Sequence, residues 1–157
     1  MLLFLQSNNP NKFEMYLQLL SPILLGLALL PTTLLAQSNS PENLHPIEVK
    51  MNNCIDKNPS TAGVTGCLDT AYTEWDAELN KFYKLLTGII NTTQKTALRN
   101  AERAWLEYRD KEFALLELLY QTKEGSMFQP MLMYDKVTVV KKRALELEDH
   151  YKLLTEY

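Results

Sequence analysis

The stretch MYDKVTVVKKRALELEDHYKLL, residues 133–154, decides the fold class of this chain. Apolar or aromatic residues occupy every position of one heptad stripe along it: Met133, Val137, Val140, Ala144, Leu147, Tyr151 and Leu154. Alternating spacings of four and three residues place these side chains on one face of an α-helix. The β-branched run 137–140 would by itself suggest a short strand, but the uninterrupted helical period outweighs it. The pattern therefore predicts a long amphipathic helix.

The segment 64–90 has the same period and a wider apolar face. All but one of its heptad positions are apolar, Glu78 being the exception: Val64, Leu68, Ala71, Trp75, Glu78, Phe82, Leu85 and Ile89. An adjoining stripe holds Tyr72, Leu79, Tyr83, Leu86 and Ile90. A face this wide can pack against two neighbours. Because Gly63 and Gly66 disfavour a helix interior, we expect an irregular first turn.

A third periodic segment lies between these two. Its stripe consists of Leu98, Ala101, Trp105, Tyr108, Leu115 and Leu119, with interruptions at Gln94 and Glu112. Asn91 and Gln94, three residues apart, resemble a capping box at the start of this helix. The sequon that begins at Asn91 would also accept a glycan, but helix capping explains the same residues.

Three amphipathic helices joined by short turns predict an all-α fold. Numbered in chain order, the first helix contains residues 64–90, the second contains the segment that follows Asn91, and the third contains residues 133–154. We expect Gly125 to end the second helix, with Ser126 and Pro130 as alternative starts of the third. An antiparallel bundle of three main helices is the simplest way to bury three apolar stripes, and we assign it to residues 60–157. Residues 37–59 contain three prolines and no sustained period, which predicts an irregular N-terminal arm.

Residues 1–36 are predicted to be a signal peptide. They contain an eight-residue apolar centre, 23–30, and the small residue Ala36 at a possible cleavage position. An apolar centre of this length is too short to span a bilayer comfortably. The positive charge before it is weak, because Glu14 offsets Lys12, and this leaves an uncleaved membrane anchor as the alternative. We therefore expect a periplasmic or secreted protein, without stable membrane insertion once the leader is removed.

Cys54 and Cys67 are the only cysteines, and both follow the predicted leader. An even number of cysteines in an exported chain favours a disulfide between them. Two buried free thiols are the alternative. We expect no metal site, because two cysteines without a neighbouring histidine supply too few ligands.

The chain is mildly acidic, with a net charge of −3 from 16 Lys plus Arg and 19 Asp plus Glu. Removing residues 1–36 takes away one lysine and one glutamate, so 15 basic and 18 acidic residues keep the net charge at −3. This balance argues against a nucleic-acid partner. It is compatible with a basic protein partner.

No group of residues in the sequence predicts an enzyme. The only histidines are His45 and His150, and no G-x-S-x-G motif or phosphate-binding glycine motif is present. A glycosidase needs two carboxylates that face each other across a cleft. Glu74, Asp76 and Glu78 are close in sequence, but residues two apart on a helix point in different directions, so they do not predict such a pair. We therefore expect a non-enzyme that needs no cofactor.

The segment AERAWLEYRDKEF in the second helix concentrates aromatic and charged residues. Trp105 and Tyr108 lie on the predicted buried stripe. Arg109, four residues after Trp105, can place its guanidinium group over that ring. Asp110 lies off the stripe and can reach Asn80 or a basic residue of a neighbouring helix. These residues predict a structural network in the core, and a binding surface is the alternative.

Three segments together resemble the LprI-like lysozyme-inhibitor family of small exported helical domains: EWDAELNKFYKLL, AERAWLEYRDKEF and GSMFQPMLMYDKVTVVKKRALEL. The resemblance covers roughly residues 54–151. Its matching positions are Cys67, Leu79, Asn80, Tyr83, Ala104, Trp105, Tyr108, Arg109, Asp110, Gly125, Ser126, Arg143 and Leu147. The residues that we assign to the structural network are Asn80, Tyr83, Trp105, Tyr108, Arg109, Asp110 and Arg143.

The family typically has two further cysteines, at positions where this sequence has Phe113 and Val137. If these positions face each other, apolar packing replaces a covalent link there. The fold is then expected to survive with some loss of stability.

The resemblance implies a protein that inhibits lysozyme-like enzymes by occluding their cleft with a rigid protrusion. The expected protrusions are the turns 91–95 and 123–129, the second of which contains Lys123. The acidic residues that can meet a cationic lysozyme surface are Glu74, Asp76 and Glu78. An envelope scaffold or an immunity-type module that binds another protein without catalysis is the alternative function.

Overall fold

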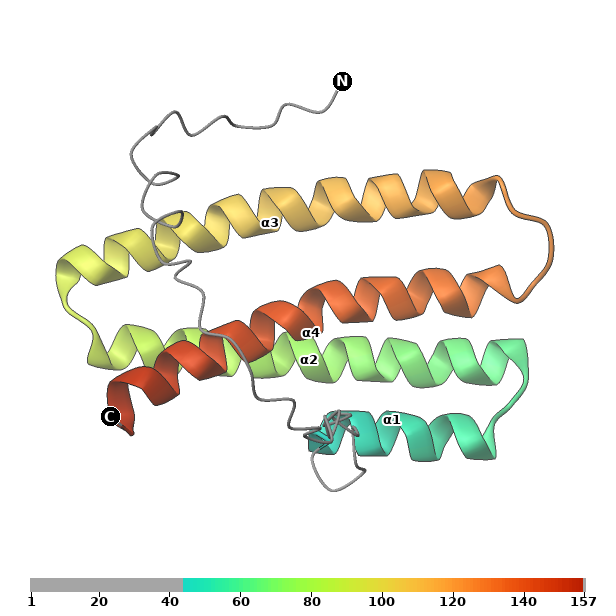
Figure 1. The fold of residues 1–157 in the computed structure, drawn as a ribbon, viewed down its shortest axis with the longest axis horizontal. Helices are drawn as coiled ribbons and strands as arrows, with labels where there is room; N and C mark the ends of the chain where they lie inside the picture. Colours follow the sequence, from blue (N-terminus) through green and yellow to red (C-terminus); the bar gives the residue numbers. More distant parts are fainter. Residues whose placement is uncertain (1–43, 157) are drawn as a thin grey trace, which may run out of the picture. The chain divides into compact units, whose positions relative to one another are not determined.

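The computed structural model describes residues 44–156, which form four α-helices (Figure 1). They are α1 (Pro46–Lys57), α2 (Thr61–Ile89), α3 (Thr92–Gln121) and α4 (Phe128–Thr155). Successive helices run antiparallel, and the described residues contain no strand, so the all-α prediction is confirmed. The predicted leader, 1–36, lies outside the described residues, as does the start of the predicted arm. None of the four helices is both long and apolar enough to cross a membrane.

The core forms where α2 packs against α4. The largest fully buried side chains are Trp75 and Leu68 on α2, with Leu147 and Val140 on α4. The predicted stripe of α4 is buried at Val137, Val140, Ala144 and Leu147, half-buried at Met133 and Tyr151, and exposed at Leu154. Burying a leucine or valine side chain contributes about 1.5–3 kcal/mol. The contact between α2 and α4 is therefore the main source of stability.

The predicted irregular arm over 37–59 is wrong for most of its described part, because α1 lies within it. The His45 Nδ1 atom accepts a hydrogen bond from the Ile47 amide at 3.2 Å. Pro46 occupies the first helical position, where no amide hydrogen is needed. Three apolar residues spaced by four pack against the core: Ile47, Met51 and Ile55. This spacing was the signal of a short helix in a segment rich in proline.

A disulfide and two ion pairs hold α1 in place. The predicted disulfide between Cys54 and Cys67 is confirmed, with Cα atoms 5.7 Å apart, and it joins α1 to α2. The ion pairs are Lys50 with Glu74 on α2 and Glu48 with Lys141 on α4. Since α1 has no buried residue, its position depends on these links and on the apolar contacts.

α2 begins with a regular turn, although we expected Gly63 and Gly66 to disrupt it. The Ser60 hydroxyl oxygen accepts a hydrogen bond from the Gly63 amide at 3.1 Å and caps the helix. Gly63 is required for a steric reason, because a Cβ atom there would lie 2.5 Å from the Asn58 carbonyl oxygen. The glycine therefore allows the tight connection from α1 into α2.

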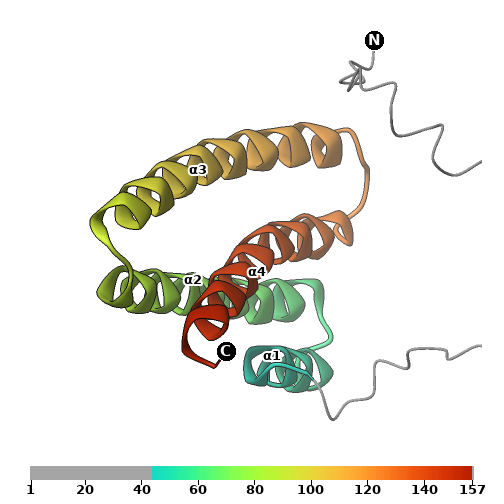
Figure 2. The same ribbon diagram turned by 60° about the vertical axis from the view of Figure 1, so that its left-hand side comes forward.

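α3 packs less closely than predicted. Its ribbon lies further from α2 and α4 than those two lie from each other (Figures 1 and 2), and Glu102 is its only buried residue. Leu98 and Trp105 are partly buried. Four residues of its predicted stripe are exposed: Ala101, Tyr108, Leu115 and Leu119. The predicted burial of this stripe is wrong, because α1 and α4 already cover the wide apolar face of α2.

The turns around α3 follow the predictions in part. The capping box is present, because the Gln94 amide donates to Asn91 Oδ1 and the Asn91 amide donates to Gln94 Oε1, both at 3.0 Å. α3 ends before Gly125, which instead lies in the α3–α4 turn (residues 122–127) with φ of 107°. Glycine adopts this conformation without strain. α4 begins at Phe128, between the two predicted starts.

Candidate binding surfaces

A groove of about 290 Å³ lies between α2 and α3, and we call it the α2–α3 groove. Its apolar lining consists of Leu79, Tyr83, Trp105 and Leu106, and its polar lining of Asp76, Asn80, Arg99, Glu102, Arg103 and Arg109. Four of the residues assigned to the predicted network therefore meet here: Asn80, Tyr83, Trp105 and Arg109. They line a groove at the surface, whereas we expected them to form a layer inside the core.

Arg109 lies over the aromatic rings of its own helix. Its guanidinium carbon is 5.6 Å from the centroid of Trp105, as the spacing of four residues predicted, and 6.0 Å from that of Phe113. Its Nε and Nη2 atoms donate to Asp110 Oδ1 at 2.9 and 2.7 Å. The expected reach of Asp110 to Asn80 or to a neighbouring helix is therefore not observed, because an adjacent residue on the same helix binds its carboxylate.

Asn80 also binds within its own helix. Its amide nitrogen donates to the Asp76 carbonyl oxygen at 2.8 Å and to Asp76 Oδ2 at 3.0 Å. Tyr83 lies one turn further along α2 and lines the groove beside Asn80. Both residues contribute to the α2 side of the groove, and neither forms a hydrogen bond to α3 in the described residues.

The Arg143 side chain on α4 binds Glu102 on α3, and the sequence did not identify Glu102. Arg143 Nε donates to Glu102 Oε1 at 3.0 Å and Nη1 donates to Glu146 Oε2 at 2.9 Å. Burial would lower the pKa of Arg143, but the hydrogen bonds to Glu102 and Glu146 outweigh burial and raise it. The missed signal was a carboxylate three residues before Trp105, on the inward side of the helix.

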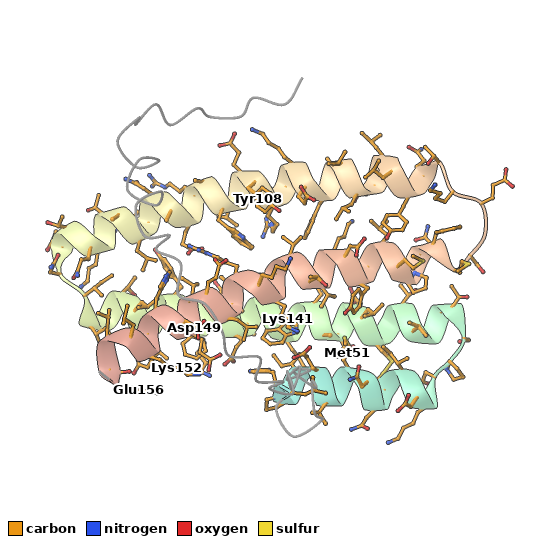
Figure 3. All side chains as sticks on the ribbon, viewed as in Figure 1. Met51, Tyr108, Lys141, Asp149, Lys152 and Glu156 are labelled. Atoms are coloured by element: carbon orange, nitrogen blue, oxygen red, sulfur yellow. A yellow bond between two sulfur atoms is a disulfide. The ribbon has the colours of Figure 1, made fainter. Side chains whose placement is uncertain are left out.

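Tyr108 lies outside the groove, on the exposed part of α3, where Figure 3 labels it. Its side chain is 52% exposed, so it is not part of a buried network. Phe113 and Val137, the two positions at which we expected apolar packing to replace a covalent link, both take part in such packing. Val137 is buried and Phe113 packs against the buried cluster that contains it.

A second surface is formed at the α3–α4 turn. A hollow of about 650 Å³ there is lined by Leu118, Lys123, Gly125, Phe128 and other residues of both helices. Leu118 and Met127 are 63% and 61% exposed, and Leu119 is exposed as well. Lys123 has no ion-pair partner among residues 44–156. The turn therefore presents apolar side chains and one lysine ammonium group to solvent.

Two contacts fix the end of α3 against α4, beside this turn. The Tyr120 hydroxyl donates to Asp135 Oδ2 at 2.7 Å, and Lys136 Nζ lies 2.6 Å from Glu117 Oε1. The hydrogen bond to Asp135 raises the pKa of Tyr120, and partial burial and the negative charge of Asp135 act in the same direction. The turn is thus held between two anchored helix ends.

The acidic residues proposed to meet a cationic surface all have partners in the helical unit. Glu74 pairs with Lys50, Asp76 accepts from Asn80, and Glu78 lies 2.6 Å from Lys81. Glu74 faces α1 and Asp76 lines the α2–α3 groove, so the three carboxylates do not form one surface. Within residues 44–156, no cluster of three histidine, cysteine or acidic residues has the geometry to hold a metal ion.

Comparisons with known proteins agree with this architecture. A family model described as lysozyme inhibitor LprI matches residues 50–147. An uncharacterized protein of Rhizobium meliloti (strain 1021) is 34% identical over an alignment of 97 residues, and the match covers 53% of this chain and 68% of the relative. The crystal structure of an uncharacterized protein from Burkholderia thailandensis is similar with a TM-score of 0.65 and 28% identity. That match covers 69% of this chain and 55% of the crystallised chain.

Proposed function

Because this chain belongs to the lysozyme inhibitor LprI family, we propose that it is a periplasmic or secreted protein that inhibits lysozyme-like cell-wall hydrolases. It acts by binding to the enzyme and blocking its cleft, without catalysis of its own. The observation that carries the proposal, beside the family, is the α3–α4 turn. This turn and the adjacent end of α3 combine exposed apolar side chains with a lysine that has no ion-pair partner in the described residues.

The chemistry of the turn suits the cleft of a glycoside hydrolase. Such clefts contain a pair of carboxylic acid residues that flank the scissile bond. The ammonium group of Lys123 is complementary to that negative charge. Leu118 and Met127 supply apolar area around it, as the centres of protein interfaces do. Glu124 next to Lys123 opposes the attraction, so its removal is expected to strengthen binding.

The anchoring of the turn supports binding by a preformed protrusion. The hydrogen bond from Tyr120 to Asp135 and the ion pair of Lys136 with Glu117 hold the two helix ends. A loop that is already ordered loses little conformational entropy when it enters a cleft. Residues 91–95, which form the N-cap and first turn of α3, remain the second predicted protrusion, and the capping box orders them in a similar way.

The test is the lysis of peptidoglycan by several types of lysozyme, with and without the exported protein. We expect lysis to slow at near-stoichiometric ratios. Lys123→Ala should weaken the inhibition about tenfold, the value of one charge-assisted hydrogen bond, whereas Glu124→Gln should strengthen it. Lys84→Ala is the matched control, because Lys84 lies near the end of α2 that leads into the start of α3, and it also has no ion pair in the described residues.

Two results would contradict the proposal at different levels. If Lys123→Ala inhibits lysis as strongly as Lys84→Ala does, the α3–α4 turn is not the part that enters the enzyme cleft. Residues 91–95 then become the candidate protrusion. If no lysozyme type is slowed, the inhibitor function itself fails. An envelope scaffold or immunity-type module then becomes the function to test.

A further inference from the structure

We propose that the α2–α3 groove binds the carboxylate of a small acylated amino acid, the same chemical group that ends a peptide chain. This site is separate from the α3–α4 turn and does not rest on the proposed inhibition of lysozyme. The groove holds two arginines without carboxylate partners, an apolar lining and a volume suited to one residue of this kind.

Arg99 and Arg103 supply the positive charge. They lie one turn apart on α3, so their side chains share one side of that helix, and both line the groove. Neither forms an ion pair within residues 44–156, whereas Arg109 and Arg143 do. A guanidinium group donates two parallel hydrogen bonds to a carboxylate, which makes arginine well suited to bind this group.

The acidic residues of the groove do not cancel this charge. Glu102 is bound by Arg143 from α4. The Asp76 side chain accepts a hydrogen bond from Asn80 and is a single charge against two arginines. The groove is therefore locally positive, although the chain as a whole has a net charge of −3. A carboxylate is the ligand group that this excess favours.

The apolar lining favours an aliphatic body beside the carboxylate. Leu79 is 7% exposed and lies beside Tyr83, Trp105 and Leu106 in the groove. Arg109 already lies over the Trp105 ring, so that face is not available to a stacked sugar ring. At about 30 Å³ per water molecule, the groove has space for about ten waters, which is about the size of an acylated amino acid.

The experiment compares two ligands that differ only in charge. The exported protein is titrated with N-acetylleucine and with N-acetylleucinamide, its uncharged analogue, by calorimetry and by tryptophan fluorescence, since Trp105 lines the groove and the second tryptophan, Trp75, is fully buried outside it. We expect the acid to bind about tenfold or more tightly than the amide, since the carboxylate contributes charge-assisted hydrogen bonds. A peptide that ends in leucine should bind more tightly than N-acetylleucine if the natural ligand is a chain terminus, and equally if it is a small acid.

A matched pair of variants assigns the binding to the groove. Arg99→Gln with Arg103→Gln should lower the affinity for N-acetylleucine about tenfold or more at unchanged melting temperature. Lys57→Gln with Lys142→Gln removes the same charge from other exposed positions that have no ion pair in the described residues, and it should leave the affinity unchanged. Equal binding of acid and amide, binding of neither, or unchanged affinity in the arginine variant would each overturn the proposal. Lysozyme inhibition is expected to persist in the arginine variant, which separates this site from the turn.

Discussion

Glu102 and Arg143 form an ion pair between α3 and α4, and each side chain is only 11% exposed. Charges removed from water lose hydration, and each then depends on its partner. Arg143 also binds Glu146, whereas Glu102 has no second basic partner among the described residues. Among the ion pairs of the described residues, this one has the two least exposed side chains.

We predict that Glu102→Leu lowers the free energy of unfolding by about 3 kcal/mol. This is the lower end of the range for a broken buried pair, because Arg143 keeps Glu146. Combining Glu102→Leu with Arg143→Met should restore most of the loss, since no buried charge is left without a partner. Urea unfolding measures both. The exposed pair Glu107–Lys111 is the control, and its removal should change the free energy of unfolding far less, because water screens both charges. A single variant as stable as this control would contradict the prediction.

The hydrogen bond from Tyr120 to Asp135 predicts a dependence of stability on alkaline pH. It raises the pKa of Tyr120 in the folded state above its ordinary value of about 10. Because the folded-state pKa is raised, the contribution of this hydrogen bond to the free energy of unfolding is complete below about pH 10 and is lost as pH rises through the folded-state pKa.

We therefore expect the difference in unfolding free energy between the wild type and Tyr120→Phe to be constant up to about pH 10 and to shrink above it. Denaturant unfolding across this range measures the difference. Tyr134→Phe changes an exposed tyrosine whose hydroxyl forms no hydrogen bond in the described residues, and it serves as the control. A difference that grows with pH would have the wrong sign.

At the scale of elements, α1 depends most on a covalent link. It is a helix of 12 residues without a buried side chain, and helices of this length are marginal in isolation. The disulfide between Cys54 and Cys67 closes a loop with a sequence separation of 13 residues. It keeps the apolar side of α1 close to α2.

Reducing this disulfide, or changing both cysteines to serine, should lower the free energy of unfolding by about 3 kcal/mol. Without the disulfide, the rate of amide hydrogen exchange should increase more in α1 than in α4, because α1 has fewer buried contacts. A reducing agent should have no effect on the double serine variant. Uniform acceleration over all four helices would show that α1 is not the dependent element.

The exposed side of α3 should contribute little to stability, in contrast to the disulfide that holds α1. Leu115→Lys and Leu119→Lys should change the free energy of unfolding by less than about 0.5 kcal/mol, because both residues are about half exposed. Leu147→Ala on α4, at a fully buried position, should cost about 2–5 kcal/mol. Chemical denaturation compares the three variants. A large loss at Leu115 would mean that the stripe of α3 is buried after all, as its period suggested.

At the scale of the whole molecule, export remains a proposal. We predict that the exported protein begins at Gln37 and that Ala36→Asp, which removes the small residue before the cleavage position, prevents processing. Mass spectrometry of periplasmic or secreted protein gives its N-terminus. Full-length chain retained in the membrane fraction of the wild type would instead support the alternative of an uncleaved anchor.

The candidate groove was only partly predictable, and the reason is visible in its residues. The spacing of Trp105 and Arg109 lies within one helix, where the helical repeat places the two side chains together. Glu102 and Arg143 are 41 residues apart, and only the packing of α3 beside α4 brings them into contact. Asp110 was expected to reach Asn80 or a basic residue of a neighbouring helix, but Asp110 and Asn80 each bind a residue of their own helix.

Local geometry explains what the sequence by itself determined: the helical fold, the positions of α2 to α4, the capping box at Asn91 and the pairing of the two cysteines. The helical period and the caps depend on residues that are close in sequence, so they can be read along the chain. The disulfide could be predicted because the chain has two cysteines and therefore one possible pairing. Only the tertiary structure decided that α1 covers α2, that α3 keeps an exposed apolar side, and that a groove opens beneath it. Several apolar faces compete for the same area on α2, and which of them is buried depends on the packing of all the helices together.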